Sequence, residues 1–253
     1  MVLHIEKSNK IATVTLDRPP VNALTIGLYQ ELAELFESTA DWDDINCVVL
    51  TAQGSRVFCA GLDLNEFLAA SVEDDPARAA IVRRMFSAVR HAAMPVIAAV
   101  NGPALGAGAV LASVCDIRLA SENATFGLPE INVGRCGGGA HIGRLVPQSV
   151  LRMMAFTGQP INAAEALRVG LVNEVLPSDA LMNRAMSVAQ VIAAKAPLGL
   201  RLGKASLNEI EFMPVEDGYA VEQGYSTRLM ATEDAREATR AVVQKRPAVF
   251  VGR

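Results

Sequence analysis

The chain has 253 residues, of which 51% are hydrophobic and 20% are charged, and its formal net charge at pH 7 is −4. This composition supplies enough apolar side chains for one substantial core and excludes a largely disordered chain. An acidic balance without clustered Lys and Arg argues against a nucleic-acid partner, although a few local cations could still bind a small anion.

The first part of the chain predicts a hairpin, a helix and a buried strand. Residues 2–6 and 11–16 alternate apolar and polar side chains around a polar connector, which indicates a β-hairpin. Thr25 is a plausible N-cap for an amphipathic helix over 25–40. The apolar run at 46–51 then predicts a buried strand.

The middle of the chain repeats one order of elements. A loop at 52–64 follows the first buried strand and leads into a helical region that runs to about His91. The order strand, glycine-rich loop and short helix recurs at 95–100, 101–108 and 109–113, and another strand is expected at 116–120. This predicts an α/β fold of repeated strand–strand–helix turns, although no clear sequence period identifies a repeat.

The last third is mainly helical apart from a short strand expected at 171–176. Pro197 and Pro214 mark helix starts. We expect residues 1–195 to form the core and residues 196–253 to form a helical oligomerisation region. Its apolar faces have no sheet left to cover, so they should pack on a neighbouring subunit.

Cysteine usage and hydropathy predict a cytoplasmic protein without a membrane segment. Neither a CxxC pair nor the dense spacing of a secreted disulfide framework occurs among Cys47, Cys59, Cys115 and Cys136. The N-terminal residues lack the basic and apolar regions of a signal peptide. Residues 96–115 are uncharged and long enough to span a bilayer, but their prolines and glycines divide them into a strand, a turn and a short helix.

Two glycine-rich loops are candidate parts of a binding site. The loops at 60–64 and 106–108 each follow a predicted buried strand and open a helical segment. Glycines allow close approach, so each loop could aim a backbone N–H at one shared oxygen and form an oxyanion hole. For any single loop of this kind, glycines that only turn the chain are the commoner explanation.

Several motifs in a fixed order make the chain resemble the crotonase, or enoyl-CoA hydratase/isomerase, superfamily. They are LDRPPVNAL (16–24), FCAGLDL (58–64), AAVNGPALGAG (98–108), CDIRLAS (115–121), FGLPEINVG (126–134), FTG (156–158), AAEALRVGLVNEV (163–175) and ATEDAREATRAVVQKRPAVF (231–250). The resemblance implies a spiral of strand–strand–helix turns with a C-terminal helical region, assembled as a homotrimer or a hexamer made of two trimers.

The resemblance also implies an acyl-CoA substrate whose enolate is held by the backbone N–H groups of Leu62 and Ala107. Hydratases of the superfamily use two glutamates; one is present as Glu130, and Val110 stands at the other position. Glu130 could otherwise be a solvated carboxylate or an ion-pair partner of Arg135 or Arg144. Hydration of the C2=C3 bond needs one group to activate water at C3 and another to handle the C2 proton. One base is enough to move a proton between C2 and C4.

A single glutamate therefore favours isomerisation of 3-enoyl to 2-enoyl thioesters. Three alternatives stay open: a 2-enoyl-CoA hydratase despite Val110, a non-catalytic acyl-CoA-binding trimer, and a specialised hydrolase, decarboxylase or dehydratase. The segment 134–147 departs from the hydratase pattern at Arg135, Cys136 and His141, and specialisation would lie between Arg135 and His141. Arg135 could meet a substrate carboxylate or orient Glu130, and Cys136 could be a wall residue.

By the same resemblance, the CoA path involves Arg18, Asn22, Ala23, Leu24 and Ala60, and Lys245 can reach the CoA of a neighbouring subunit. For a lone Arg or Lys, such as Arg18 or Lys245, an ordinary surface charge is the commoner explanation. Coenzyme A enters as part of the substrate, and we expect no other cofactor. No cluster has metal-ligand spacing, and the GxSxG, GxGxxG and Walker patterns are absent.

Overall fold

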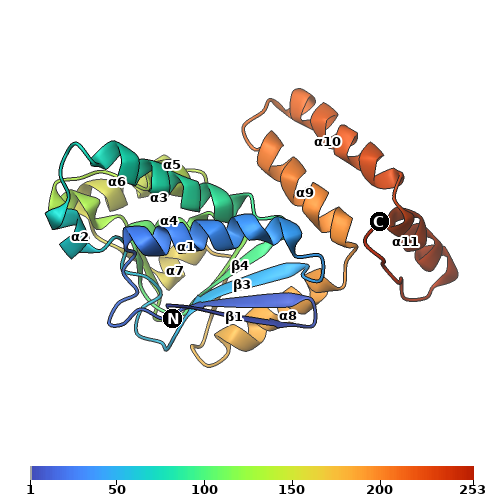
Figure 1. Cartoon of the computed structure of the whole chain (residues 1–253), viewed down its shortest axis with the longest axis horizontal. Coiled ribbons are helices and arrows are strands. Elements are labelled where there is room, and N and C mark those ends of the chain that lie inside the picture. The colour runs from blue at the N-terminus through green and yellow to red at the C-terminus, as the bar shows by residue number, and fades with distance from the viewer. Residues whose placement is uncertain (1) are drawn as a thin grey trace.

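The computed structural model describes residues 2–253 and is built on a six-stranded sheet (Figure 1). Met1, which the predicted core includes, lies outside these residues. The strand order is β1 (Leu3–Ser8), β2 (Ile11–Leu16), β3 (Cys47–Ala52), β4 (Val96–Val100), β6 (Ile117–Ser121) and β9 (Glu174–Leu176). β1 and β2 form the predicted antiparallel hairpin, and every later pair is parallel.

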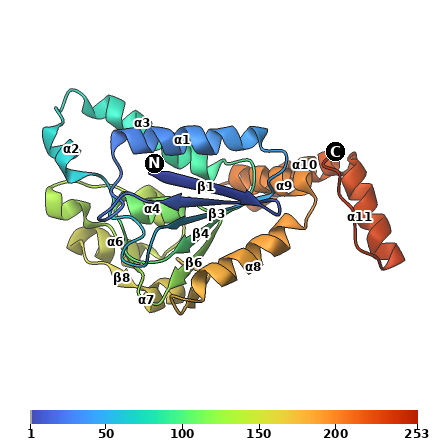
Figure 2. The same ribbon diagram turned by 60° about the horizontal axis from the view of Figure 1, so that its bottom comes forward.

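Helices cover both faces of this sheet, which explains the continuous apolar runs of its central strands. Every residue of β3 and β4 is buried. Figure 2 shows α1 (Ile26–Glu37) and α3 (Asp75–Arg90) above the sheet and α8 (Leu181–Ala193) below it. Two buried apolar clusters lie on the two sides of the sheet, the larger one under α1 and α3.

Two predicted helices end or break earlier than expected. Thr25 caps α1, its hydroxyl accepting from the Leu28 N–H at 3.2 Å. The helix stops at Glu37, and the chain tightens into a 3-10 turn, Ser38–Asp41. The helical region before His91 is two helices, α2 (Leu64–Ala69) and α3, because Ala70 adopts an extended conformation.

A second, three-stranded sheet was not predicted. It consists of β5 (Ala104–Leu105), β7 (Thr125–Gly127) and β8 (Ile161–Asn162). The remaining helices of this part are α4 (Ala107–Ser113), the 3-10 turn η2 (Pro129–Val133), α5 (Gly139–Ile142), α6 (Gln148–Thr157) and α7 (Ala163–Arg168). β9 is shorter than the predicted strand because Leu171 and Val172 still donate to the carbonyl of Ala166.

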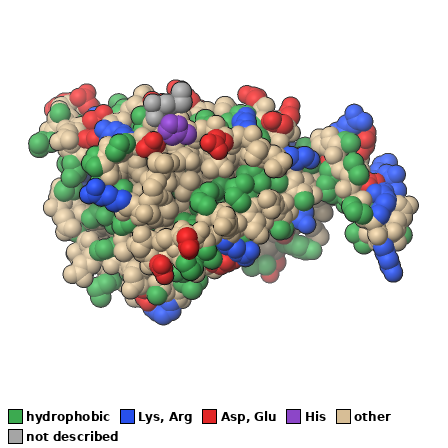
Figure 3. All heavy atoms as spheres, turned by 90° about the horizontal axis from the view of Figure 1, so that it is seen from below, with side chains coloured by type: hydrophobic (Ala, Val, Ile, Leu, Met, Phe, Trp, Pro, Cys, Tyr) green, Lys and Arg blue, Asp and Glu red, His purple; other side chains and the backbone are tan. Residues whose placement is uncertain are grey.

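The C-terminal region contains α9 (Pro197–Ile210), α10 (Val215–Met230) and α11 (Glu233–Gln244). Polar contacts hold α9 on the core: the Lys204 ammonium lies 2.7 Å from the Asp116 carboxylate, and the Asn208 amide donates to the Arg90 carbonyl at 2.9 Å. α10 and α11 project away from the sheet (Figure 1). Figure 3 shows Lys and Arg side chains gathered on this projecting end.

Apolar side chains are exposed along the C-terminal region, among them Leu207, Phe212, Val215, Met230, Val242 and Val243. Cover by a neighbouring subunit therefore stays a prediction. Among residues 2–253, none of the helices is long and apolar enough to cross a membrane. The uncharged stretch 96–115 forms β4, β5 and α4, as its prolines and glycines indicate.

Candidate functional site

A cavity of about 270 Å³ lies between the helices above the sheet and the segment that follows β7. Leu24, Leu62, Ala107, Val110 and Glu130, which the sequence singled out, all line it. They come from four separate parts of the chain, since Ala107 and Val110 both belong to α4. The fold therefore brings together residues that are far apart in the sequence.

The two glycine-rich loops lie against each other. The Leu24 N–H donates to the Gly61 carbonyl at 2.7 Å, and the Leu105 N–H donates to the Cys59 carbonyl at 2.9 Å. Gly61 has φ +97°, and a side chain there would meet the Leu105 carbonyl oxygen at 2.8 Å. Gly108 has no room for a side chain either, because a Cβ would lie 2.1 Å from the Cys59 oxygen. Glycine is thus required by contact between the loops.

This contact leaves two backbone donors at the cavity. A Cβ built on Gly61 would lie 3.4 Å from the Ala107 nitrogen, so the loop that carries Leu62 directly adjoins the start of α4. Within residues 2–253, neither the Leu62 N–H nor the Ala107 N–H donates to a backbone carbonyl outside its own element. An oxyanion hole needs two donors without such a partner beside one cavity.

Glu130 lies in η2, directly after Pro129, and its carboxylate reaches the cavity beside Gly106. Burial raises the pKa of this carboxyl above its ordinary value. Its Oε2 atom is buried and has no hydrogen-bond partner among the described residues. Neither alternative ion pair forms, because Arg135 contacts Asp75 at 2.9 Å and Arg144 contacts Glu211 at 2.6 Å.

The other acidic side chains that line the cavity are paired. Asp63 contacts Arg18 at 2.9 Å, Glu66 contacts Arg78 at 3.7 Å, and Asp75 contacts Arg135. Val110 is only 2% exposed and packs beside Gly138, where a Cβ would come within 2.9 Å of the valine methyl group. Among the described residues, Glu130 is therefore the one cavity carboxylate without a cation.

Comparisons with known proteins agree with this geometry. The family model for enoyl-CoA hydratase/isomerase matches residues 6–253. The chain belongs to the enoyl-CoA hydratase/isomerase family. The resemblance predicted from the sequence is confirmed, and the protein is an enzyme of that family.

Individual relatives span the whole chain. A 2,3-dehydroadipyl-CoA hydratase of Escherichia coli is 37% identical, over 99% of this chain and 99% of the relative. A (7aS)-7a-methyl-1,5-dioxo-2,3,5,6,7,7a-hexahydro-1H-indene-carboxyl-CoA hydrolase of Mycobacterium tuberculosis is 39% identical, over 93% and 95%. The crystal structure of an enoyl-CoA hydratase from Bacillus anthracis superposes with a TM-score of 0.95 at 29% identity and covers all of both chains. The predicted crotonase-like α/β fold is therefore confirmed.

In this member of the enoyl-CoA hydratase/isomerase family, the predicted CoA segment is fixed to the glycine loop. The Asn22 amide donates to the carbonyls of Val57 and Phe58 at 3.1 and 3.2 Å. Arg18 donates to the Ala23 carbonyl at 3.0 Å besides its ion pair with Asp63, and the Ala60 N–H donates to the Val21 carbonyl at 3.0 Å. These contacts hold the segment beside the cavity mouth.

Lys245 does not join this site in the same chain. It ends α11, which lies far from the helices of the cavity (Figure 1). It is absent from the residues that line the cavity. Its predicted reach to the CoA of a neighbouring subunit stays a prediction.

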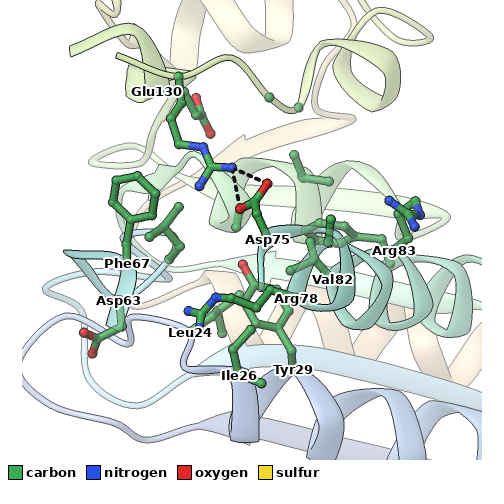
Figure 4. Close-up of a pocket in the computed structure, with 18 of the residues that line it drawn as sticks. Leu24, Ile26, Tyr29, Asp63, Phe67, Asp75, Arg78, Val82, Arg83 and Glu130 are labelled. Carbon is green, nitrogen blue, oxygen red and sulfur yellow. Dashed lines mark hydrogen bonds and ion pairs between the residues drawn. The ribbon is translucent and has the colours of Figure 1, made fainter. Parts of the chain in front are cut away.

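The sequence analysis did not identify the residues that α1, α2 and α3 contribute, among them Tyr29, Phe67, Arg78 and Phe86. Figure 4 shows the charged pair that closes one side of the cavity, in which an arginine meets Asp75 through two hydrogen bonds. That arginine is Arg135, which also stacks over the Phe67 ring at 4.7 Å. The Arg135 guanidinium therefore forms no ion pair with Glu130, and the two residues meet only through the backbone, where the Arg135 N–H donates to the Glu130 carbonyl at 2.9 Å.

The two other unusual residues of the 134–147 segment differ in position. Cys136 is exposed and lines the cavity, as a wall residue would. His141 lies in α5 behind the cavity, where its ring packs on Phe86 at 5.6 Å between centroids. Burial, together with Arg144 and Arg90, lowers the pKa of His141, so the imidazole is held neutral.

Proposed function

We propose that the protein interconverts 3-enoyl-CoA and 2-enoyl-CoA thioesters and that Glu130 is the group that moves the proton. The observation that carries this proposal is the isolation of Glu130 in the cavity: it alone among the lining carboxylates has no cationic partner in the described structure. A carboxylate that is partly desolvated and unpaired is a stronger base than a solvated one.

The thioester carbonyl would accept from the N–H groups of Leu62 and Ala107. These donors adjoin one another and line the same cavity as Glu130. As the enolate forms, negative charge collects on this oxygen, and each such donor is typically worth about 2.7–4 kcal/mol in the transition state. This interaction acts mainly in the transition state, because the charge is absent from the ground state.

The reaction needs one base. Glu130 would remove a proton from C2 of the 3-enoyl thioester, and the electron pair of the C–H bond would delocalise over the dienolate to the carbonyl oxygen. The carboxylic acid formed on Glu130 would return the proton to C4, which places the double bond between C2 and C3. Atoms and charges balance without water, and Val110 leaves the opposite position free of a second acid.

The CoA moiety would run past Arg18, Asn22, Ala23, Leu24 and Ala60, since this segment is bonded to the loop that carries Leu62. A homotrimer, or a pair of trimers, would cover the apolar side chains of the C-terminal region. Lys245 of one subunit would then lie near the CoA of the next.

Hydration of a 2-enoyl thioester is the second candidate, because the relative from E. coli is named a hydratase. The relative from M. tuberculosis is named a hydrolase, so the reaction varies among chains of similar identity. Hydration would have to proceed with Glu130 alone at the cavity. General acid–base help is worth roughly 10²- to 10⁴-fold, so a missing partner would slow hydration without abolishing it.

The test offers the purified protein a 3-enoyl-CoA and a 2-enoyl-CoA of equal chain length and follows the absorbance of the conjugated thioester. We expect a fast gain from the 3-enoyl substrate, which falls by about 10²-fold or more in Glu130→Gln. Glu122→Gln, an exposed carboxylate outside the cavity, is the matched control.

Val110→Glu should add hydration of the 2-enoyl substrate by restoring a second carboxylate. Fast hydration by the unaltered protein would contradict the isomerase proposal. An unchanged rate in Glu130→Gln would contradict the role of that residue, and if thioesters still bind, it would point to an acyl-CoA-binding protein instead.

A further inference from the structure

Tyr29 is the buried polar group of the cavity that the proposed reaction does not use. Its side chain lines the cavity and is only 2% exposed. Among residues 2–253, its hydroxyl takes part in no hydrogen bond, and the hydroxyl oxygen is not one of the fully enclosed polar atoms, so it is open to the cavity. A ligand that fills the cavity buries this hydroxyl, and a buried hydroxyl left unpaired loses its hydration without compensation. The missing partner is therefore to be sought in what fills the cavity.

The protein environment keeps this hydroxyl protonated. Burial raises the pKa of Tyr29 above its ordinary value, and the nearby Cys59 thiol and Glu130 carboxyl raise it further. A neutral phenol can donate a hydrogen bond but cannot act as a base at physiological pH. A protonated Tyr29 can therefore serve as a fixed donor to an accepting oxygen.

The surroundings of Tyr29 fix its orientation. Its ring makes an edge contact with Phe86, with 6.2 Å between centroids, and Val82 lies one turn earlier on the same helix. Glu66 is engaged with Arg78 and the Ile26 N–H, and Asp75 with Arg135. Glu130 is unpaired, but it makes no hydrogen bond with Tyr29. In Figure 4 Tyr29 rises from α1 on the side of the pocket opposite Glu130.

We propose that Tyr29 determines substrate specificity by donating a hydrogen bond to an oxygen atom on the acyl chain, beyond the thioester carbonyl. This inference rests on the proposed function, in which the thioester oxygen is held by Leu62 and Ala107 and the chain passes Glu130. The substrate class is then an enoyl-CoA whose acyl part carries a keto, carboxyl or other accepting oxygen. A plain hydrocarbon chain would bury the Tyr29 hydroxyl without a partner.

The proposal predicts that loss of the Tyr29 hydroxyl has opposite effects on the binding of oxygen-bearing and plain acyl chains. Loss of the hydroxyl should weaken binding of an oxygen-bearing chain and improve binding of a plain chain, because the phenylalanine ring is of nearly the same size and leaves nothing unpaired. A tyrosine that only fills space would change both affinities alike.

The test measures dissociation constants of saturated CoA thioesters, which cannot react. The ligands are a plain alkanoyl-CoA and a matched-length series with one ketone oxygen moved along the chain from C5 onward. We expect at least one ketone ligand to bind the unaltered protein about 10- to 100-fold more tightly than the plain ligand, and Tyr29→Phe to remove that preference. Tyr219→Phe, which deletes a hydroxyl from an exposed tyrosine of α10, is the control.

The outcomes separate this inference from the proposed function. Equal dissociation constants for plain and ketone ligands, with the same ratio in Tyr29→Phe, would overturn the role of Tyr29. Water would then stay hydrogen-bonded to the hydroxyl when the ligand binds. It would leave the proton transfer by Glu130 intact. Failure of every thioester to bind would overturn the proposed function, and the inference about Tyr29 with it.

Discussion

The carboxylate of Glu130 lies directly against the backbone of Gly106, where an added Cβ would come within 2.8 Å of its Oε1 atom. Gly106 also precedes Ala107, one of the two proposed donors to the thioester oxygen. The base and the oxyanion hole are thus positioned against each other by a residue that has no side chain.

We predict that Gly106→Ala lowers kcat/KM by about 10²-fold or more, because a displacement of catalytic groups by about 1 Å has that effect. Gly106 has φ +53°, so the substitution also strains the backbone. Gly54→Ala is the matched control, since Gly54 has φ +75° and open space around its Cα. Equal losses of activity in the two variants would show that the contact with Glu130 is not the cause.

The rate of isomerisation should depend on the ionisation of Glu130. Only the carboxylate form can accept the C2 proton, and burial raises the pKa of this group above its ordinary value of 4.5. We therefore expect kcat/KM to rise with pH through this raised pKa and to level off above it. A pH series with the 3-enoyl substrate measures this. A rate that falls with pH over the same range would mean that Glu130 acts as an acid in the limiting step.

Local motifs made part of the site predictable from sequence. Leu62, Ala107 and Glu130 stand in motifs that resemble those of the family, so the resemblance predicts that they share one site, and all three line one cavity. Tyr29 could not be identified in this way. It lies on the face of α1 that also carries Leu28 and Leu32, and all three are buried. Which of them reaches a cavity depends on how α1 packs against α3.

In the fold, too, elements with a local sequence signal could be predicted and elements without one could not. Long runs of apolar residues predicted the strands of the main sheet, since side-chain periodicity reports burial. β5 and β8 have two residues each, which is too short for any periodicity, so the second sheet exists only through its long-range pairing. The pairing of Arg135 with Asp75 could not be predicted from the sequence either, because Asp75 is 60 residues away at the start of α3.

Glu130→Gln should stabilise the folded protein at neutral pH. The folded-state pKa of Glu130 is raised, so the folded form holds its proton more tightly than the unfolded chain does. The stability of the unaltered protein therefore falls as pH rises from the ordinary glutamate pKa through the raised pKa. The variant lacks this loss, so its advantage in free energy of unfolding should appear over that range and stay constant above it.

Urea unfolding at a series of pH values measures this advantage. Glu122→Gln is again the control, because Glu122 is exposed. A difference between Glu130→Gln and the unaltered protein that is the same at every pH would mean that burial of the charge does not cause it.

The attachment of α9 to the core should depend on Lys204. Its side chain is 4% exposed, and its ammonium group donates to the Asp116 carboxylate at 2.7 Å and to the Met94 carbonyl at 3.2 Å. Lys204→Met keeps most of the side-chain volume and removes the charge. Because hydrogen bonds to charged groups are worth about 1.5–3 kcal/mol, we expect a loss of that size in the free energy of unfolding. Lys195→Met, at an exposed position after α8, should have little effect.

A double-mutant cycle with Asp116→Asn separates the ion pair from the packing of the lysine stem. In the native protein the Val96 N–H, at the start of β4, donates to the Asp116 carboxylate at 2.7 Å. The amide oxygen of the asparagine can accept the same bond, so this N–H keeps a partner. If the two substitutions together cost less than the sum of their separate effects, the pair couples α9 to β4 and β6 directly. Strict additivity would contradict this, and the contacts of Arg201 and Asn208 would then be what holds the C-terminal region in place.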